Sequence, residues 1–299
     1  MDKNQKYSLS LSFVWIILAY FVALAAAVAT VFLTPDLSPL WRVLLADVVA
    51  TVIVWGFGTA FSNASFYDPY WSVAPPVMAI YWWYDAGAAA MDYRQMLLLL
   101  VLFYWAIRLT ANWSCGWTGL KHEDWRYQDL RRGSGPAYPL VNLFGICMFP
   151  TLIVFAGMLP VYVLMTDQYP ANPVWELVAL VVGIGAVTVQ WVSDEQMRAF
   201  RKGALGNEAV MDKGLWAWSR HPNYFGEVAM WTSLFLFALS AGGLSLAWTG
   251  IGALSMLILF LFISIPMMDK KSVAKRPAFA EHIKNSSALM MWPPKRQPE

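Results

Sequence analysis

The chain has 299 residues, of which 59% are hydrophobic and 13% are charged, and its formal net charge is +2. Soluble domains are typically about 45–50% apolar and about 25% charged, so this composition favours a membrane protein. The small net charge gives no indication of a nucleic-acid partner. Cys115 and Cys147 show no CxxC or Cys/His spacing, which argues against a disulfide framework and against a zinc site.

Long apolar runs follow one another along the chain, and about 20 such residues span a bilayer. We therefore expect an all-α protein, a polytopic membrane helical bundle with about eight transmembrane helices. The expected spans are residues 12–33, 40–61, 68–84, 95–113, 140–165, 174–192, 224–241 and 245–266. The third run is short, so seven spans plus a re-entrant segment is the alternative. No repeat or long linker divides residues 1–299, which predicts a single integral membrane domain.

Basic residues concentrate in alternate loops of this arrangement. With the N-terminus inside, 18 of the 21 Lys and Arg residues fall on one side of the membrane. They lie near the N-terminus and in residues 114–139, 193–223 and 267–299. Only Arg42 and Arg94 fall on the other side. This pattern follows the positive-inside rule and predicts that both termini are cytoplasmic. The bacterial inner membrane and the endoplasmic reticulum both remain open, and we favour the former.

The most polar motif beside an apolar run is SRHPNYFGE, residues 219–227, which directly precedes the expected span over 228–241. Ionisable groups at the mouth of a membrane helix lose water, and they are tolerated mainly where they line a site. His221 alone would be typical of a structural histidine. Its polar and aromatic neighbours, however, indicate a binding site.

A second polar cluster lies in residues 190–201, where a helix leaves the membrane. Gln190, Asp194, Arg198 and Arg201 are spaced by four, four and three residues, so they share one helix face. One interpretation is an Asp–Arg pair on a solvated helix end. The other is a face that binds an anionic group, because the planar guanidinium of arginine suits phosphate.

Three further groups of polar residues have both a structural and a functional interpretation. Residues 122–127 alternate charged and aromatic side chains, as in an interfacial helix. Asp68 starts an apolar run and is either a helix cap or a buried acid. Within the span 95–113, Tyr104 and Arg108 are four residues apart, and Arg108 either snorkels to the interface or lines a site.

Five blocks together resemble the membrane-embedded steroid 5-alpha-reductases, in particular their uncharacterised, DUF1295-type branch. The blocks are residues 63–72, 108–113, 122–131, 193–201 and 214–227. The resemblance runs from about residue 40 to the end of the chain. It implies a seven-helix reductase core, an additional N-terminal span in residues 1–39 and a cofactor-binding part over 174–299. Residues 219–227 also resemble the C-terminal motif of isoprenylcysteine carboxyl methyltransferases.

Residue by residue, the resemblance implies a site for NADPH and a site for a carbonyl group. The positions that resemble cofactor contacts are Gln190, Asp194, Arg198, Arg201, Arg220, His221, Asn223, Tyr224, Glu227 and Arg276. Asp68 resembles the acid that holds the substrate carbonyl, and Tyr104 the tyrosine beside it. Aligning on Arg108 instead puts Trp105 at the place of that tyrosine.

The resemblance implies an NADPH-dependent reductase that acts on a C=C bond conjugated to a carbonyl in a lipophilic substrate, steroid-like or isoprenoid. Burial would keep Asp68 protonated, so that Asp68 and Tyr104 could donate hydrogen bonds to the carbonyl oxygen. Two alternatives remain open: a membrane methyltransferase that uses S-adenosylmethionine, and a non-catalytic lipid-binding protein. We expect a monomer in the lipid bilayer.

Overall fold

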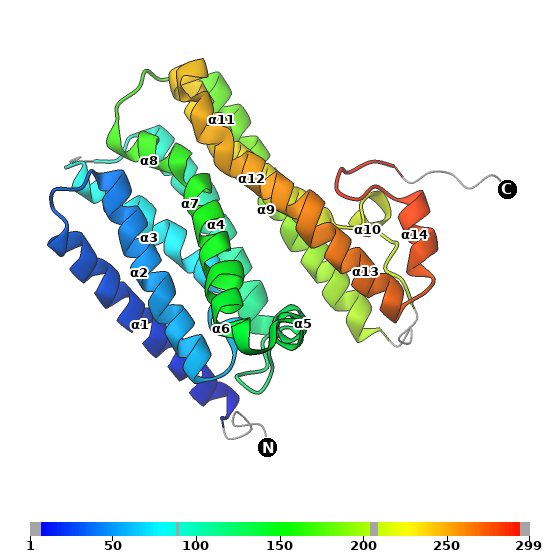
Figure 1. Cartoon of the computed structure of the whole chain (residues 1–299). Coiled ribbons are helices and arrows are strands. Elements are labelled where there is room, and N and C mark those ends of the chain that lie inside the picture. The colour runs from blue at the N-terminus through cyan, green and yellow to red at the C-terminus, as the bar shows by residue number, and fades with distance from the viewer. Residues whose placement is uncertain (1–6, 88–89, 204–208, 294–299) are drawn as a thin grey trace. The chain divides into compact units, whose positions relative to one another are not determined.

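The computed structural model describes residues 7–87, 90–203 and 209–293, and this part of the chain is helical, without a β-strand (Figure 1). The predicted all-α class is therefore confirmed. The two termini, which the sequence predicts on the same side of the membrane, lie in residues 1–6 and 294–299, outside the described residues.

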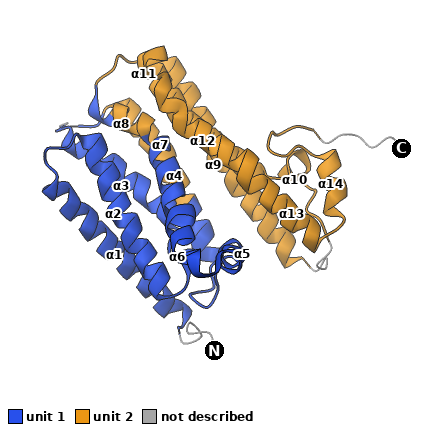
Figure 2. Ribbon diagram, viewed as in Figure 1, with its two compact units in different colours: residues 1–91, 109–158, 165–167 blue, residues 92–108, 159–164, 168–299 orange. Residues whose placement is uncertain are grey.

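The chain divides into two compact units (Figure 2). The first unit comprises residues 1–91, 109–158 and 165–167, and the second comprises residues 92–108, 159–164 and 168–299. Helix α4 (Tyr93–Gly116) contributes its beginning to the second unit and its end to the first. The expected division into an added span over 1–39 and a cofactor-binding part over 174–299 stays a prediction.

The first unit is built from apolar helices whose starts follow common capping rules. Besides the end of α4 it contains α1 (Leu9–Leu33), α2 (Pro39–Ala60), η2 (Ala64–Phe66), α3 (Tyr70–Asp85), α5 (Trp125–Ser134), η3 (Gly135–Ala137), α6 (Tyr138–Val141), the π-helical η4 (Asn142–Met148) and α7 (Phe149–Gly157). Ser8 caps α1 by accepting a hydrogen bond from the backbone N–H of Leu11. Pro39 starts α2, where its missing N–H costs nothing.

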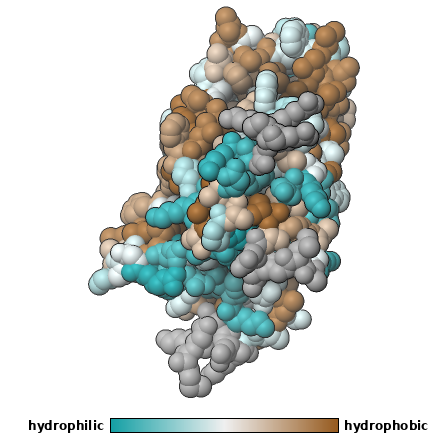
Figure 3. Space-filling model, turned by 90° about the vertical axis from the view of Figure 1, so that its right-hand side faces the viewer, coloured by the Kyte–Doolittle hydropathy of each residue, from teal (hydrophilic) through white to brown (hydrophobic). Residues whose placement is uncertain are grey.

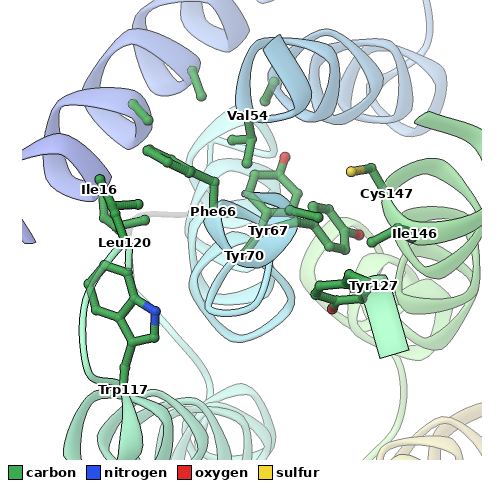
Figure 4. Packing of buried hydrophobic residues seen from close by; sticks show 14 of the residues in the cluster. Ile16, Val54, Phe66, Tyr67, Tyr70, Trp117, Leu120, Tyr127, Ile146 and Cys147 are labelled. Carbon is green, nitrogen blue, oxygen red and sulfur yellow. The ribbon is translucent and has the colours of Figure 1, made fainter. Parts of the chain in front are cut away.

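The core of the first unit is rich in aromatic side chains (Figure 4). Phe66 and Tyr67 of the turn after α2 are fully buried, and Tyr70 at the start of α3 stacks on Tyr67 with ring centroids 5.4 Å apart. Tyr127 of α5 and Cys147 of η4 complete this cluster. The tyrosines bring hydroxyl groups into an otherwise apolar core, where each of them needs a hydrogen-bond partner.

The second unit centres on the packing of α9 (Pro173–Lys202) against α11 (Pro222–Gly242), which lie side by side in Figure 1. Its other elements are the beginning of α4, most of α8 (Leu159–Thr166), α10 (Leu215–Trp218), η5 (Gly243–Gly250), α12 (Ile251–Leu259), η6 (Phe260–Ser264), α13 (Ile265–Lys275) and α14 (Phe279–Asn285). A Cβ atom on Gly183 of α9 would lie only 2.7 Å from the Ser233 Oγ of α11. Small residues therefore let these helices approach closely, as in many membrane bundles.

Six helical segments are long and apolar enough to cross a membrane, which supports an integral membrane protein. They are Leu9–Leu33, Pro39–Ala60, Tyr93–Gly116, Trp125–Gly157, Pro173–Lys202 and Pro222–Lys275. Figure 3 shows one face of the molecule, on which apolar side chains cover the upper part and hydrophilic side chains gather below. A separation of this kind is typical of a protein that is partly embedded in lipid.

The predicted count of about eight spans is not confirmed. The expected third span corresponds to α3, which has only 16 residues and contains Pro75 and Pro76. The last two expected spans lie within the 54-residue segment Pro222–Lys275. The chain turns there at Gly243, whose φ of 58° is in the left-handed region, so that α11 packs against α12.

Candidate functional site

A buried polar cluster joins α4 to α9 within the second unit. The guanidinium of Arg108 donates to the Gln190 Oε1 at 2.7 Å and forms an ion pair with Asp194. Arg108 is 7% exposed and Gln190 is fully buried. Arg108 therefore does not snorkel to the surface. Instead it holds two of the residues that the sequence analysis assigns to the cofactor site.

Two hydrogen-bond donors in this cluster have no acceptor among the described residues: the Arg108 Nε and the Gln190 Nε2. Both atoms are buried. A buried polar group without a partner costs about 1–3 kcal/mol, so native proteins rarely retain one without a reason. The pair of donors suits a ligand or an ordered water that offers acceptor atoms.

Glu227 of α11 lies near this cluster and is held by two buried indoles. Trp105 Nε1 donates to both carboxylate oxygens, at 2.9 and 3.0 Å, and Trp231 Nε1 donates to Oε1 at 3.1 Å. The neighbouring Gly226 brings α11 close to α9, because a Cβ there would lie 2.5 Å from the Gln190 Cγ. The motif residues Gly226 and Glu227 thus position the buried polar cluster.

Tyr104 and Trp105, the two candidates for the place of the carbonyl-binding tyrosine, have different surroundings in the structure. Trp105 is fully buried against Glu227. Tyr104 lies instead against α9, where its hydroxyl is 3.4 Å from the Thr188 Oγ1 and its ring tilts over Trp191. Of the two, only Tyr104 offers a hydroxyl group that could hold a carbonyl oxygen.

Arg220 and His221, both predicted cofactor contacts, share one acid on α13. Arg220 donates to the Asp269 Oδ2 at 3.0 Å, and the His221 ring lies 2.9 Å from the Asp269 Oδ1. Arg220 also donates to the backbone carbonyl of Ser286 at 2.7 Å. These contacts fasten the start of α11 to α13 and to the segment after α14. The sequence analysis missed Asp269, although it is an acid directly beside the basic pair Lys270–Lys271.

The remaining predicted cofactor residues are more accessible. Tyr224 stacks between His221, at 5.1 Å, and Phe260, at 4.5 Å. Arg198 pairs with Glu195 one turn earlier on α9. Three others lie at element ends: Arg201 is exposed in the last turn of α9, whereas Asn223 and Arg276 are half-buried. The ten predicted cofactor residues thus all belong to the second unit.

Asp68, the predicted carbonyl-binding acid, belongs to the first unit, and Tyr104 belongs to the second. Asp68 is half-buried between α2 and α3, where its Oδ1 accepts a hydrogen bond of 2.6 Å from the Tyr127 hydroxyl. Burial raises the pKa of Asp68 to about 6, and the hydrogen bond from Tyr127 opposes this rise. A carboxyl group with this pKa is mostly ionised at pH 7, so the protonated form that the sequence analysis expects is the minor one.

The first unit contains a second buried acid, Asp47 of α2, which the sequence analysis did not single out. The Tyr70 hydroxyl donates to its Oδ1 at 2.6 Å. Next to this pair, the Tyr67 hydroxyl lies 2.6 Å from the Thr151 Oγ1. An acid inside a predicted span was the available signal, because the rule that drew attention to Asp68 applies equally to Asp47.

The block over 122–131 has a structural role in the first unit. Glu123 accepts from the backbone N–H of Ala64 at 2.8 Å and pairs with Arg131 at 2.7 Å. The Asn63 amide donates to the backbone carbonyls of Leu120 and His122. These contacts tie the turn that carries Asp68 to the loop before α5.

Residues 54–286 match the model of the family described as "Protein of unknown function (DUF1295)". The chain belongs to this family. It is also 25% identical over 260 residues to an uncharacterised protein of Schizosaccharomyces pombe, with 79% of this chain and 75% of the relative covered. No solved structure matches the chain at a significant level. The DUF1295-type prediction is thus confirmed, and the relation to steroid 5-alpha-reductases stays a prediction.

Proposed function

We propose that the chain is an NADPH-dependent membrane reductase that acts on a C=C bond conjugated to a carbonyl in a lipophilic substrate. The observation that carries the proposal is the buried cluster of Arg108, Gln190 and Asp194, which keeps two donors without acceptors inside an apolar helix bundle. Such a cluster destabilises the folded protein. Because buried polar groups of this kind are usually retained only where they have a function, the cluster supports a binding role.

The residues of the second unit fit a dinucleotide. Its carboxamide and phosphate groups are rich in acceptor atoms, which the Arg108 Nε and the Gln190 Nε2 lack. Arg201 and Lys202 add exposed positive charge in the last turn of α9, and positive charge favours phosphate. When bound, NADPH would supply a hydride to the substrate.

In this proposal Asp68 of the first unit is one candidate for holding the substrate carbonyl, and Tyr104 of the second unit is another. Negative charge develops on the carbonyl oxygen during reduction, and hydrogen-bond donors placed there lower the barrier. Either the protonated fraction of Asp68 or the Tyr104 hydroxyl would donate such a hydrogen bond. Tyr127 would act as a positioning residue, because its hydroxyl already holds the Asp68 Oδ1.

A non-catalytic, lipid-binding function is the second candidate. It is favoured by the contacts of Arg220 and His221, which are both engaged by Asp269 and which therefore explain part of the SRHPNYFGE motif without a ligand. This function predicts that no nucleotide binds the chain.

The test is thermal unfolding of the purified protein in detergent, with NADPH, NADH and S-adenosylmethionine added in turn. A ligand that binds only the folded state raises the unfolding midpoint by mass action. We expect a shift with NADPH that S-adenosylmethionine does not reproduce. A shift with S-adenosylmethionine alone would favour methyl transfer, and the absence of any shift would favour the non-catalytic function.

A further inference from the structure

A second candidate site lies entirely within the first unit. A partly open cavity of about 650 Å³ is lined by residues of α1, α2, α3 and the end of α4, together with Pro69. Its walls are mainly apolar and include Ile16, Ala50 and Met78, all of them buried. Small-molecule sites in proteins are typically about 300–1,000 Å³, so the cavity is large enough for a lipid-sized ligand.

One ionisable group in this apolar wall lacks part of its hydrogen bonding. Asp47 lines the cavity and is only 5% exposed. The Tyr70 hydroxyl donates to its Oδ1 at 2.6 Å, and among the described residues no donor reaches its Oδ2. An unsatisfied carboxylate oxygen inside an apolar bundle is costly, and such acids usually mark a ligand or transport site.

Of the other polar side chains of the cavity wall, Tyr20 and Thr110 have partners, whereas the Trp113 Nε1 donor has none among the described residues. The Tyr20 hydroxyl donates to the backbone carbonyl of Phe66 at 2.9 Å. The Thr110 hydroxyl lies 2.8 Å from that of Ser72. The cavity therefore offers one strong acceptor, Asp47, within apolar surroundings.

We propose that this cavity binds a lipophilic alcohol, whose hydroxyl donates to the Asp47 Oδ2 and whose hydrocarbon part fills the apolar walls. An alcohol fits better than an amine, because a hydroxyl brings one donor and an ammonium brings three. The Oδ2 of Asp47 can satisfy the single donor of a hydroxyl. This inference does not depend on hydride transfer, since its readout is binding.

The test compares the binding of three molecules of equal chain length to the purified full-length protein in detergent. They are radiolabelled hexadecan-1-ol, its methyl ether 1-methoxyhexadecane, which lacks the donor, and hexadecylamine. We expect the alcohol to bind at least tenfold more tightly than the ether and more tightly than the amine. Equal affinities for alcohol and ether would overturn the proposal, because the cavity would then accept any hydrocarbon chain. Tighter binding of the amine would also overturn it.

A double variant tests whether the preference for the alcohol over the ether depends on Asp47. Asp47→Leu with Tyr70→Phe removes both members of the hydrogen-bonded pair, so neither is left unpartnered. This variant should bind alcohol and ether equally. A matched control is Asp129→Asn, which alters an exposed acid of the same unit and should keep the tenfold preference. A preference that persists in the double variant would contradict the assignment to Asp47. The comparison on the unmodified protein stands even if the double variant does not fold.

Discussion

Four acids of the candidate sites, two in each unit, have partners of different charge. In the first unit, Asp47 and Asp68 accept hydrogen bonds from the neutral hydroxyls of Tyr70 and Tyr127. In the second unit, Asp194 pairs with Arg108, and Asp269 pairs with Arg220.

A neutral donor leaves the charge of an acid unbalanced, whereas an arginine balances it. In the first unit, Asp47 therefore suits a ligand that brings a hydrogen-bond donor to its Oδ2. The second unit offers excess donors from arginine and glutamine, which suit a ligand rich in acceptors. This contrast can be tested by breaking the pairs one at a time.

The largest effect on stability is expected at Asp269. Changing Asp269→Ala leaves Arg220 and His221 without the acid that they share, and removing one partner of a buried ion pair typically costs about 3–5 kcal/mol. We expect a loss of about 3 kcal/mol in the free energy of unfolding, measured by denaturant titration in detergent. The control Glu281→Gln breaks an exposed pair with Lys284 and should cost less than about 1 kcal/mol. A similar cost for both variants would contradict the structural role of Asp269.

A smaller effect is expected at Gly226, where α11 touches α9. In Gly226→Ala the new Cβ would lie 2.6 Å from the backbone oxygen of Ala186, and overpacking of this kind costs about 1–3 kcal/mol. Gly185→Ala is the matched control, because a Cβ there meets no atom within 4 Å. Thermal unfolding should show a lower midpoint for Gly226→Ala alone. An unchanged midpoint would mean that the two helices can separate at this point without cost.

Asp68 should make the stability of the protein depend on pH. Its pKa is raised to about 6 in the folded chain, against about 3.9 in an unfolded chain, so the folded state binds the proton more tightly. The stabilising contribution is thus fully present below about pH 4 and is lost as the pH rises through about 6. Relative to Asp68→Asn, the unmodified protein should lose about 1–2 kcal/mol between pH 4 and pH 7. The measurement is denaturant unfolding at several pH values, and parallel curves for the two proteins would contradict the raised pKa.

The smallest effect is expected at Arg201, which is exposed at the end of α9. Its replacement by Ala removes one positive charge from the proposed phosphate side of the site and should weaken NADPH binding about threefold to tenfold, in line with the modest worth of an exposed charge. Arg132→Ala also removes an exposed charge, from the first unit, and should leave the affinity unchanged. Equal affinities in a titration of both variants would remove Arg201 from the proposed site.

The sequence predicts the helices of this chain well, because long apolar runs determine membrane spans. The expected runs 12–33 and 40–61 agree with α1 and α2 to within a few residues. The predicted count of spans is not confirmed where the length of a run alone is ambiguous. The run over 68–84 forms a helix of only 16 residues, and the runs over 224–241 and 245–266 join through a turn at Gly243 into one helical segment.

Only some contacts of the candidate site could be predicted from the sequence. Helical spacing correctly places Gln190 and Asp194 on a common face, and both meet Arg108. The contacts of Asp269 and Trp105 could not be predicted in this way, because their partners are far away in sequence and on another helix. Spacing within one helix reveals shared faces, whereas contacts between helices depend on how the helices pack.

The measurement that tests the central claim most directly is the NADPH-induced shift of the unfolding midpoint in the unmodified protein and in Gln190→Glu. This substitution keeps the Oε1 that accepts from Arg108 and removes the buried donor Nε2. We predict that NADPH stabilises the unmodified protein and that the shift is largely lost in Gln190→Glu. No shift in the unmodified protein, or an equal shift in both proteins, would contradict the assignment of this cluster to a cofactor site.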